Sequence, residues 1–542
     1  MSTYKKVSVK ELMQPSQEHI WEDTKVELNG WVCAIRVQGG GKGEDKGKSS
    51  FGFVSVMDNT SVKHMQVVMN IEKCVDKTSI ESALQRLKKG AMLTVRGKII
   101  SCPSGNSTEQ KTELITDSVQ LYGDVDAAKY PMAKHKMPLE SIRQYPHLRF
   151  KTKSMVAVHI LRNKTSYLIH QFFQERGYHW AHTPLLTAND CEGAGETFQI
   201  LTQHDKTILL NQNKLNDKVK DDKTEDDTMT IKDKIIAIKT SDTTTDIVEV
   251  EEVKRKRTFF PTDVYLSVSG QLHAEAFAHA FEKVYTYGPT FRADPSETSR
   301  HLAEFWMVEP EMAFCDLDNN MDVAENFIKE VLKYVINDCK EDLIFLNERL
   351  INEDKTKPLK DRNELNLIDR LNFVVNNDFV RINYTEAFEI LRSSKPNKKK
   401  KFKYPVNEWG VDLQSEHERF LVEKYFKKPV IIYDYPAKIK AFYMRMNEDG
   451  KTVRAMDILF PGIGEIVGGS QREERLDVLK ERISELNIDE KELWWYLDLR
   501  KYGTVKHSGF GLGLERLILF ATGMTNIRDV IPFPRTPKNA EF

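Results

Sequence analysis

The sequence lacks the features that mark several classes of protein. It has only six cysteines in 542 residues, and no two of them form a CxxC pair, which argues against a zinc ribbon, a redox pair and a disulfide framework. It has no run of about 18 apolar residues and no apolar signal segment near its first residues, so neither a membrane span nor secretion is predicted. A reducing, cytoplasmic location without membrane contact is therefore the expectation.

The sequence also lacks an excess of either charge. Its 80 Lys and Arg residues are balanced by 81 Asp and Glu residues, so any polyanionic partner must be bound by local patches. Hydrophobic residues make up 40% and charged residues 30% of the chain, which is typical of a folded globular protein. The length exceeds that of one ordinary core and predicts two domains, or one large domain with an appendage.

The first part of the chain, residues 25–122, contains short apolar runs that alternate with polar residues. Glycine and polar turns separate these runs, as expected for the strands of a small β-barrel. The glycine- and lysine-rich stretch at residues 38–50 is expected to be a loop that projects from the barrel. Residues 126–152 contain three prolines and no sustained period, which predicts a hinge.

The rest of the chain mixes helical and strand patterns. An amphipathic helix is predicted from Ser154 to Gly177, followed by a strand that ends at Pro184. The other predicted elements are a strand hairpin formed by VYTYGPTFRAD and FWMVEPEMAF, a helix over residues 322–338, and strands at KAFYMRM and VRAMDILF. Neighbouring strands that pair antiparallel beside helices indicate an α+β domain.

Two charged segments interrupt this pattern. Residues 213–257 are rich in Lys, Asp and Thr, and we expect them to form a surface insertion. KPNKKKKFK, at residues 395–403, is predicted to be a solvated loop, with contact to a nucleic-acid backbone as the alternative.

The glycine-rich stretch GFGLGLERL, at residues 509–517, matches neither a P-loop nor a dinucleotide-binding fingerprint. Its glycines, which include Gly513, allow a flat ligand to approach the backbone of a strand. Arg516 follows at the start of an apolar helix, where the helix N-terminus and the guanidinium both favour an anion.

A second candidate anion-binding arginine lies in FRADPSETSRHLAEF, at residues 291–305. Arg292 ends one predicted strand and Phe305 begins the next, so a planar base can stack on Phe305 while Arg292 binds a phosphate. Arg300 and His301, in the turn between the strands, can cover the rest of that ligand. A charged hairpin with an ordinary buried phenylalanine is the alternative.

A pair of acids, Asp457 and Glu465, lies at the ends of neighbouring predicted strands in MDILFPGIGEIVGGSQREERLDVL. Two carboxylates beside two phosphate-binding arginines suit Mg²⁺, which prefers oxygen ligands and bridges triphosphate oxygens. Solvated acids at the rim of a sheet are the alternative for each residue alone. The three clusters together supply a cation site, a phosphate clamp and a platform for a base.

The helix that leads to the strand ending at Pro184, then FRAD…RHLAEF, then GFGLGLERL resemble, in this order, motifs one, two and three of the class II aminoacyl-tRNA synthetases. NDCEGAGETF, SGQLHAEAF, WGVDLQSEHERFL and IRDVIPFPRTPKNAEF are similar, within subclass IIb, to asparaginyl-tRNA synthetases. The resemblance implies an α+β fold with an N-terminal OB-fold β-barrel and a class II catalytic domain built on an antiparallel sheet flanked by helices. The implied domains are an anticodon-binding barrel over residues 1–125, a hinge over 126–152, and a catalytic domain over 153–542 that carries the insertion.

The resemblance also implies roles for individual residues. Arg292 and Arg516 are expected to be catalytic and to bind the phosphates of ATP. The implied ATP site further contains Arg300, His301, Phe305, Asp457, Glu465 and Gly513, and Asp457 and Glu465 are its Mg²⁺ ligands. The implied amino-acid site contains Glu192, Gln271, Glu309 and Arg472. Phe53 and Gln66 match positions that bind the anticodon.

The implied substrates are ATP, L-asparagine and tRNA(Asn), and Pro184 with its preceding helix implies a homodimer. Aspartyl enzymes carry a lysine where this chain has Ala274, so Arg472 is expected to bind an amide oxygen while an acid such as Glu309 favours the amide nitrogen. Which carboxylate accepts the amide protons stays open. Asp294 stands where the family often has glutamate, which leaves its role open too.

Three alternatives to an asparagine-specific ligase remain. An aspartyl or non-discriminating ligase would share most of these motifs. An asparagine-forming ligase would share the catalytic core, but Phe53 and Gln66 in the barrel argue against it. A non-catalytic paralogue would be expected to have lost Arg292, Arg516 or the two acids, all of which are present.

Overall fold

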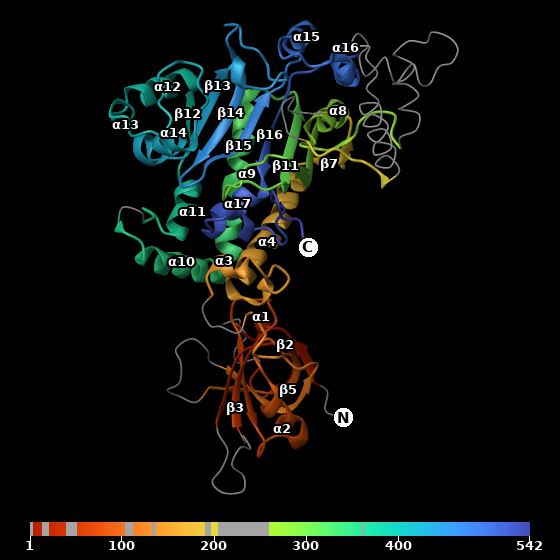
Figure 1. The fold of residues 1–542 in the computed structure, drawn as a ribbon, viewed down its shortest axis with the longest axis vertical. Coiled ribbons are helices and arrows are strands. Elements are labelled where there is room, and N and C mark those ends of the chain that lie inside the picture. Colours follow the sequence, from red (N-terminus) through yellow and green to blue (C-terminus); the bar gives the residue numbers. More distant parts are fainter. Residues whose placement is uncertain are drawn as a thin grey trace, which may run out of the picture.

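The computed structural model describes most of the chain, and the statements below concern those residues. They are residues 4–13, 21–38, 51–102, 112–132, 137–189, 197–203, 259–359 and 362–542. Glu192, the insertion at residues 213–257 and nearly all of the loop predicted at 38–50 lie outside this set. Figure 1 shows a small barrel below a much larger unit that is built on a wide sheet.

The small unit is a barrel, as the alternating pattern predicts. Its strands are β1 (Lys5–Val7), β2 (Lys25–Gln38), β3 (Phe51–Met57), β4 (Met65–Asn70), β5 (Met92–Ser101) and β6 (Thr112–Leu121). The order is β1-β2-β3-β4-β6-β5, and pairing of β2 with β5 closes the sheet. Helices α1 (Val9–Leu12) and α2 (Lys77–Arg86) accompany it. Val54, Val56 and Val67 point inward because alternate residues of a strand face one side.

The large unit contains an eight-stranded sheet. Its strands are β7 (His179–Trp180), β10 (Lys283–Phe291), β11 (Glu304–Ala313), β12 (Val380–Asn383), β13 (Val430–Pro436), β14 (Thr452–Phe460), β15 (Gly464–Gln471) and β16 (His507–Gly513). The order is β12-β13-β14-β15-β16-β11-β10-β7. The six central strands pair antiparallel, and only β12 and β7, at the edges, pair parallel. The predicted α+β class is confirmed.

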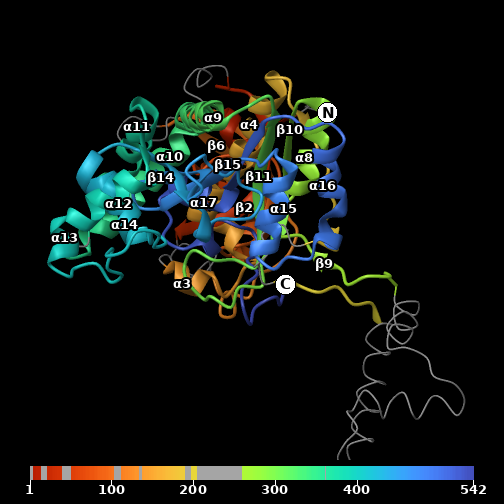
Figure 2. The same cartoon turned by 90° about the horizontal axis from the view of Figure 1, so that it is seen from above.

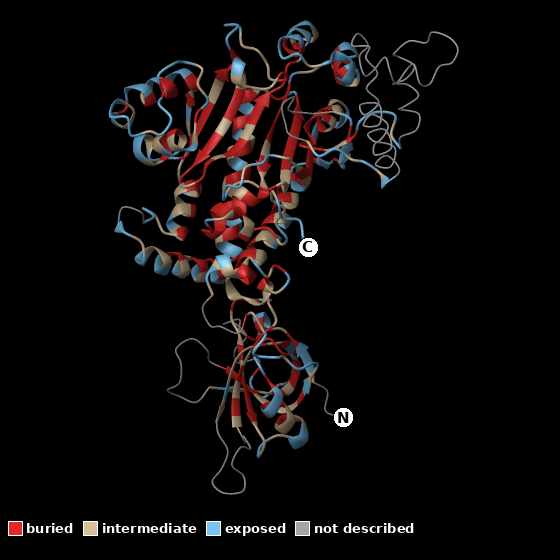
Figure 3. Ribbon diagram, viewed as in Figure 1, coloured by how far each residue is buried: buried red, intermediate tan, exposed pale blue. Residues whose placement is uncertain are grey.

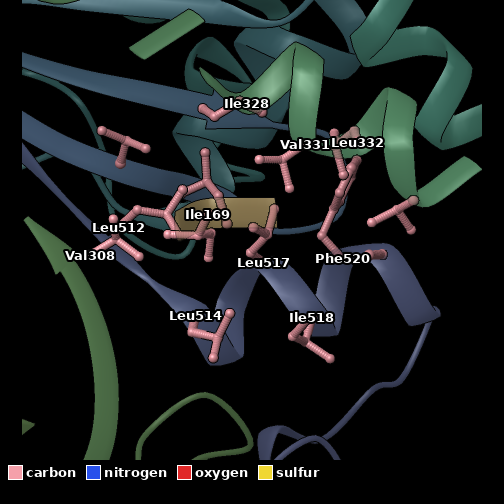
Figure 4. Packing of buried hydrophobic residues seen from close by; sticks show 14 of the residues in the cluster. Ile169, Val308, Ile328, Val331, Leu332, Leu512, Leu514, Leu517, Ile518 and Phe520 are labelled. Carbon is pink, nitrogen blue, oxygen red and sulfur yellow. The ribbon is translucent and has the colours of Figure 1, made fainter. Parts of the chain in front are cut away.

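Three helices cover one face of this sheet. They are α4 (Lys153–Glu175), α9 (Leu317–Asp338) and α17 (Leu514–Thr522). Figure 4 shows Leu514, Leu517 and Phe520 of α17 packed among apolar side chains of the sheet and of the other two helices. Asp316 caps α9 by accepting a hydrogen bond from the backbone nitrogen of Asn319. Figure 3 shows that burial is concentrated in the central strands and in these helix faces.

The remaining helices lie beyond the edges of the sheet or, like α10 (Lys340–Lys355) and α11 (Leu367–Asn376), against the three-helix layer. They are α3 (Leu139–Ile142), α8 (Gln271–Phe281), α10 (Lys340–Lys355), α11 (Leu367–Asn376), α12 (Tyr384–Ser393), α13 (Lys395–Lys398), α14 (Ser415–Arg419), α15 (Leu476–Glu485) and α16 (Trp494–Lys501). Figure 2 shows α12, α13 and α14 beyond one edge and α8 with α16 beyond the other. A separate two-stranded ribbon pairs β8 (Leu186–Thr187) with β9 (Tyr265–Leu266). Within the described parts of the chain, no helix is both long and apolar enough to cross a membrane.

The described part of the predicted hinge is held firmly against the C-terminal segment. Arg149 is fully buried, and its guanidinium donates hydrogen bonds to the carbonyls of Arg528, Ile531 and Pro532. Arg143 donates two hydrogen bonds, of 2.7 and 2.6 Å, to the carboxylate of Asp529. These contacts join the chain between the two units to the end of the large unit.

Three expectations about local structure require correction. Residues 440–446 form turns with isolated bridges rather than a strand, because Phe442 and Tyr443 pack against α8, α15 and α16. The strand predicted before Pro184 pairs with β10 only at His179 and Trp180. Part of the loop predicted at residues 395–403 forms α13, which Ser394 caps by accepting a hydrogen bond from the backbone nitrogen of Asn397.

The packing of α17 predicts a large loss of stability on truncation. Leu517 is 1% exposed in the main core, so Leu517→Ala should lower the free energy of unfolding of the large unit by about 2–5 kcal/mol. Chemical denaturation followed by tryptophan fluorescence measures this change. Leu359→Ala is the matched control because Leu359 is 82% exposed, and equal losses in the two variants would contradict the assignment.

Candidate active site

Two adjoining cavities lie on the sheet beside the glycine-bearing strands. The first has a volume of about 220 Å³ and the second about 210 Å³. They share four lining residues, which are Arg292, Met307, Glu465 and Gly511. A larger cavity, of about 1020 Å³, lies between the barrel and α10, and its lining includes no residue predicted for the active site. The chemistry suggested by the sequence therefore belongs to the two smaller cavities.

The alternation of strand residues places polar groups in the cavities. On β11, Met307, Glu309 and Glu311 line the first cavity, whereas Val308 between them lies in the apolar core. On β14, Asp457 lines the same cavity while Ile458 lies in the core. One face of the sheet thus supplies the core and the other supplies the site.

The second cavity brings together the residues predicted for a nucleotide. Its lining includes Arg292, Arg300, His301, Phe305, Gly513 and Arg516. The guanidinium of Arg292 lies 5.4 Å from the centre of the Phe305 ring. Arg300 donates a hydrogen bond of 2.8 Å to Ser415 Oγ, and His301 Nδ1 lies 2.8 Å from Thr298 Oγ1. Two arginines beside a half-buried aromatic ring suit a phosphorylated base.

Asp294 also lines the second cavity, but it makes a local contact. Its Oδ1 accepts a hydrogen bond of 2.8 Å from the backbone nitrogen of Ser296. The side chain therefore shapes the turn between β10 and β11.

Asp457 and Glu465 converge over Gly468. A Cβ atom added to Gly468 would lie 3.1 Å from Glu465 Oε1 and 3.5 Å from Asp457 Oδ1. Asp457 Oδ2 accepts a hydrogen bond of 2.8 Å from Lys440 Nζ, and Arg516 Nη1 lies 3.4 Å from Glu465 Oε2. The converging oxygens fit a hard divalent cation whose remaining ligands are phosphate oxygens and waters. In the part of the chain that the structure describes, no group of three or more His, Cys, Asp or Glu side chains forms a metal site.

Glu418 is a further acid beside this pair that the sequence did not indicate. Its Oε2 accepts a hydrogen bond of 3.1 Å from the backbone nitrogen of Glu465. Burial and the neighbouring carboxylate of Glu465 raise the pKa of Glu418 to about 8. A carboxyl in this place can bear a proton at neutral pH, which limits the negative charge beside Asp457 and Glu465.

Arg472 forms the deep end of the first cavity. It is 2% exposed, and its Nε donates a hydrogen bond of 3.2 Å to Glu311 Oε2. Its Nη2 donates to Glu311 Oε1, and its Nη1 donates to Ser470 Oγ at 2.7 Å. Burial opposes the charge on Arg472, but the carboxylates of Glu311 and Glu275 outweigh it and raise the pKa of the arginine. Arg472 therefore stays charged in a fixed orientation.

A second buried carboxylate, Glu275 of α8, lies behind Arg472. Its Oε2 accepts hydrogen bonds from Tyr496 Oη at 2.7 Å and from Arg500 Nη2 at 2.9 Å, and His507 Nε2 lies 2.9 Å away. Burial opposes ionisation of Glu275, but Arg500, His507 and Arg472 outweigh burial and lower its pKa below the ordinary value. Glu275 is therefore an ionised carboxylate in the interior.

Gln271 and Glu309, which are predicted for the amino-acid site, both line the first cavity. Gln271 Nε2 donates a hydrogen bond of 3.1 Å to Glu275 Oε1. Glu309 accepts hydrogen bonds from Ser269 Oγ, from the backbone nitrogen of Gly270 at 3.0 Å and from Thr286 Oγ1 at 2.8 Å. The carboxylate that contacts Arg472 directly is that of Glu311.

Ala274 does not line this cavity. It is fully buried in a small cluster with Ala181, Ala278 and Val284. The charged side chain that α8 directs toward Arg472 belongs to the next residue, Glu275. The negative charge that α8 places beside Arg472 is therefore that of Glu275, which the sequence motifs do not indicate.

Phe53 and Gln66 lie on neighbouring barrel strands. Phe53 is half-buried and lies edge to face with Phe51 at 4.9 Å, outside the barrel core. Gln66 Nε2 donates a hydrogen bond of 2.5 Å to Glu113 Oε1. The register pairs Phe53 with Val68 and Ser55 with Gln66, so Phe53 and Gln66 are diagonal neighbours on one face. An aromatic ring beside an amide suits an unpaired base.

Several residues of the site were missed from the sequence. They are Ser269, Glu275, Glu311, Lys440, Tyr443, Ser470, Tyr496, Arg500 and His507 in the large unit, and Glu113 in the barrel. Glu311 had a detectable signal because it follows Glu309 by two positions on a strand and so faces the same side. The partners of Glu275 come from α8, α16 and β16, and no sequence spacing brings them together.

Comparison with known proteins places these features in one family. Residues 233–537 match the family described as tRNA synthetases class II (D, K and N). An asparagine–tRNA ligase of Nostoc sp. is 46% identical over 520 residues, which cover 96% of this chain and 97% of the relative. That of Cytophaga hutchinsonii is 44% identical over 538 residues, which cover 99% and 100%.

Among solved structures, the chain is similar to asparaginyl-tRNA synthetase from Pyrococcus horikoshii complexed with asparaginyl-adenylate. The TM-score is 0.73, the identity is 27%, and the match covers 99% of each chain. This likeness extends over the barrel and the large unit together.

The pairing of Arg472 with Glu311 predicts a steep cost when one charge is removed. Glu311→Gln should lower the free energy of unfolding by about 3–5 kcal/mol, because a buried guanidinium loses its bidentate partner. The control is Glu389→Gln, which breaks an exposed pair with Arg392 and should cost less than about 1 kcal/mol. Urea denaturation compares the two, and similar small losses would show that the Arg472–Glu311 pair is dispensable.

Proposed function

This chain belongs to the class II tRNA synthetases of the D, K and N group, and from that premise we propose how its two cavities ligate asparagine to tRNA. The reaction activates L-asparagine with ATP and then transfers the asparaginyl group to tRNA(Asn). The residue assignments rest on one observation, which is that the two adjoining cavities share Arg292. This guanidinium lies where a ligand in one cavity can meet a ligand in the other.

ATP occupies the second cavity in this proposal. Phe305 stacks on the adenine, and Arg292 binds the α-phosphate. Arg516, at the start of α17, binds the γ-phosphate where the helix N-terminus adds partial positive charge. Arg300, His301 and Gly513 complete the lining of the nucleotide site.

The amino acid occupies the first cavity. Arg472 donates a hydrogen bond to the side-chain oxygen of asparagine, and Gln271 with Glu192 binds the α-amino group. Glu309 lies along the same wall and is a candidate acceptor for the side-chain nitrogen. Glu309 already accepts three hydrogen bonds, so Glu311 is the second candidate.

Activation needs no nucleophile from the protein. The α-carboxylate oxygen of asparagine attacks the α-phosphorus of ATP, and the bond to the bridging oxygen breaks to release pyrophosphate. Arg292 neutralises charge on the α-phosphate while the cavity walls hold the carboxylate in line. Positioning and electrostatic stabilisation therefore provide the rate enhancement.

Mg²⁺ is the proposed cofactor, and Asp457 and Glu465 would hold it. The cation would supply charge neutralisation on the triphosphate. Lys440 contributes a second positive charge at the same place through its contact with Asp457. Glu418 limits the negative charge there when it is protonated.

Transfer brings the tRNA to both units. The terminal ribose hydroxyl of the tRNA attacks the carbonyl carbon of asparaginyl-adenylate and releases AMP. Phe53 stacks on an anticodon base and Gln66 reads its edge, since unpaired bases are recognised by stacking and edge hydrogen bonds. The cytoplasm is the proposed location because tRNA and ATP are available there.

A homodimer is the proposed assembly. We infer an apolar face around α4, β7 and β8 from Tyr167, Trp180, Leu185 and Leu186, which are 65%, 44%, 42% and 46% exposed. Such a patch on a folded chain marks an interface. A neighbouring cavity of about 470 Å³, lined by Tyr287, Trp306 and Phe533 among others, can accept side chains of a second copy.

Amino-acid-dependent ATP–pyrophosphate exchange tests this function. The wild-type protein should exchange with asparagine, and Arg516→Ala should lower the rate by roughly 10²–10³-fold because a phosphate ligand is lost. Binding of tRNA, measured by filter retention, should remain largely intact in this variant.

Arg392→Ala, at an exposed surface pair, is the control and should exchange like the wild type. Exchange with aspartate alone would overturn the asparagine assignment and favour the aspartyl alternative. Unchanged exchange in Arg516→Ala would refute the assigned role of that residue.

The proposed dimer predicts a change of mass on one substitution. Tyr167→Glu should convert the dimer to a monomer, because an exposed aromatic side chain at the apolar face is replaced by a charge. Light scattering after gel filtration measures the mass. Tyr425→Glu is the control, since Tyr425 is 53% exposed but lies beyond the opposite edge of the sheet. Loss of the dimer in both variants, or in neither, would contradict the assignment.

A further inference from the structure

The buried charges behind Arg472 form a linked set that extends away from the cavity. Arg472 contacts Glu311, and its Nε lies 3.9 Å from Glu275 Oε1. Glu275 in turn forms an ion pair of 2.9 Å with Arg500. All four side chains are at most 3% exposed. In so dry a place, water screens these charges weakly.

Arg472 has donors left for a ligand. A guanidinium has five N–H groups, and three of those in Arg472 donate to Glu311 and Ser470. Tyr443 lies beside it, with the ring centre 5.2 Å from the guanidinium carbon. The remaining N–H groups can donate to either an amide oxygen or a carboxylate, so hydrogen-bond geometry at Arg472 does not by itself distinguish asparagine from aspartate.

The side chains of asparagine and aspartate differ in charge, and Glu275 changes the electrostatic potential that such a charge meets at Arg472. Glu275 does not line the cavity, yet its negative charge lies next to the arginine that does. A negative charge behind Arg472 lowers the positive potential that a ligand meets. This leaves the binding of a neutral amide nearly unchanged and weakens the binding of a carboxylate.

We propose that Glu275 is a positioning residue that sets the selection of asparagine over aspartate through Arg472. The proposal rests on the function argued above and deepens it. Glu275 is anchored by Gln271, Tyr496, Arg500 and His507, so its charge is held at one distance from Arg472. The cavity therefore presents a cation whose positive potential is already partly cancelled.

The size of the effect follows from Coulomb's law. A unit charge about 8 Å from the ligand, at an effective dielectric of about 20, changes the relative binding of a charged ligand by roughly thirtyfold. Removing the charge of Glu275 should thus shift selectivity by about ten- to thirtyfold. Removing the charge of Arg500, on the far side of Glu275, should shift it in the opposite direction.

The test measures kcat/KM for asparagine and for aspartate by ATP–pyrophosphate exchange. In Glu275→Gln the ratio of asparagine to aspartate should fall by about tenfold or more, with the gain for aspartate seen mainly in KM. In Arg500→Gln the ratio should rise. The double variant removes one charge of each sign, so its ratio should return toward that of the wild type.

Tyr496→Phe is the matched control, because it removes a hydrogen bond to the same oxygen of Glu275 without changing charge. Its ratio should equal that of the wild type even if both rates fall. An unchanged ratio in Glu275→Gln, or an equal shift in Tyr496→Phe, would overturn the proposal.

If Glu275→Gln does not fold, as judged by circular dichroism, the test depends on Arg500→Gln. A ratio of asparagine to aspartate in Arg500→Gln that is equal to or below that of the wild type then overturns the proposal. Failure of the wild type to exchange with asparagine would instead refute the proposed function. The two failures are therefore distinguishable.

Discussion

The alternation of side chains along antiparallel strands is the constraint on which the rest of this structure depends. In β11, Val308 and Met312 face the core, whereas Met307, Glu309 and Glu311 face the first cavity, and in β14 Ile458 faces the core, whereas Asp457 faces that cavity. The same strands therefore build the core and the site. A shift of register by one residue would bury Glu309 and Asp457 among α4, α9 and α17 and expose the core.

A second consequence is that charge is concentrated in a dry interior. Arg472, Arg500, Glu275 and Glu311 lie together beneath the first cavity. Burying such groups costs free energy that pairing only partly offsets, so stability alone does not account for them. Their arrangement matches the needs of a site that must orient one small polar molecule and reject a charged analogue of nearly the same shape.

The link between the two units shows how distant segments cooperate. Arg143 and Arg149 lie between the barrel and the sheet in sequence, but their partners are in residues 528–532. The C-terminal segment also contacts the turn between β10 and β11, where the backbone nitrogen of Ala303 donates to the carbonyl of Arg535. The segment that joins the two units and the turn beside the second cavity are thus attached to the same stretch of chain.

The sequence by itself determined the barrel, the α+β class and several residues that line the second cavity, because these depend on local period and on long motifs. Arg292, Phe305 and Arg516 were found in this way, and the structure brings them to one cavity. Residues 440–446 have the apolar pattern of a strand but form none, because Phe442 and Tyr443 are apolar for a different reason. They pack against α8, α15 and α16.

Only the tertiary structure decided the charges beneath the first cavity. Glu275, Arg500 and His507 come from α8, α16 and β16, and their meeting depends on how these elements pack. The sequence motif indicates Ala274 as the position that decides specificity. Ala274 instead packs in an apolar cluster, and the neighbouring Glu275 faces Arg472. Adjacent residues of a helix point in different directions, so the identity of a motif does not reveal which of its side chains faces the site.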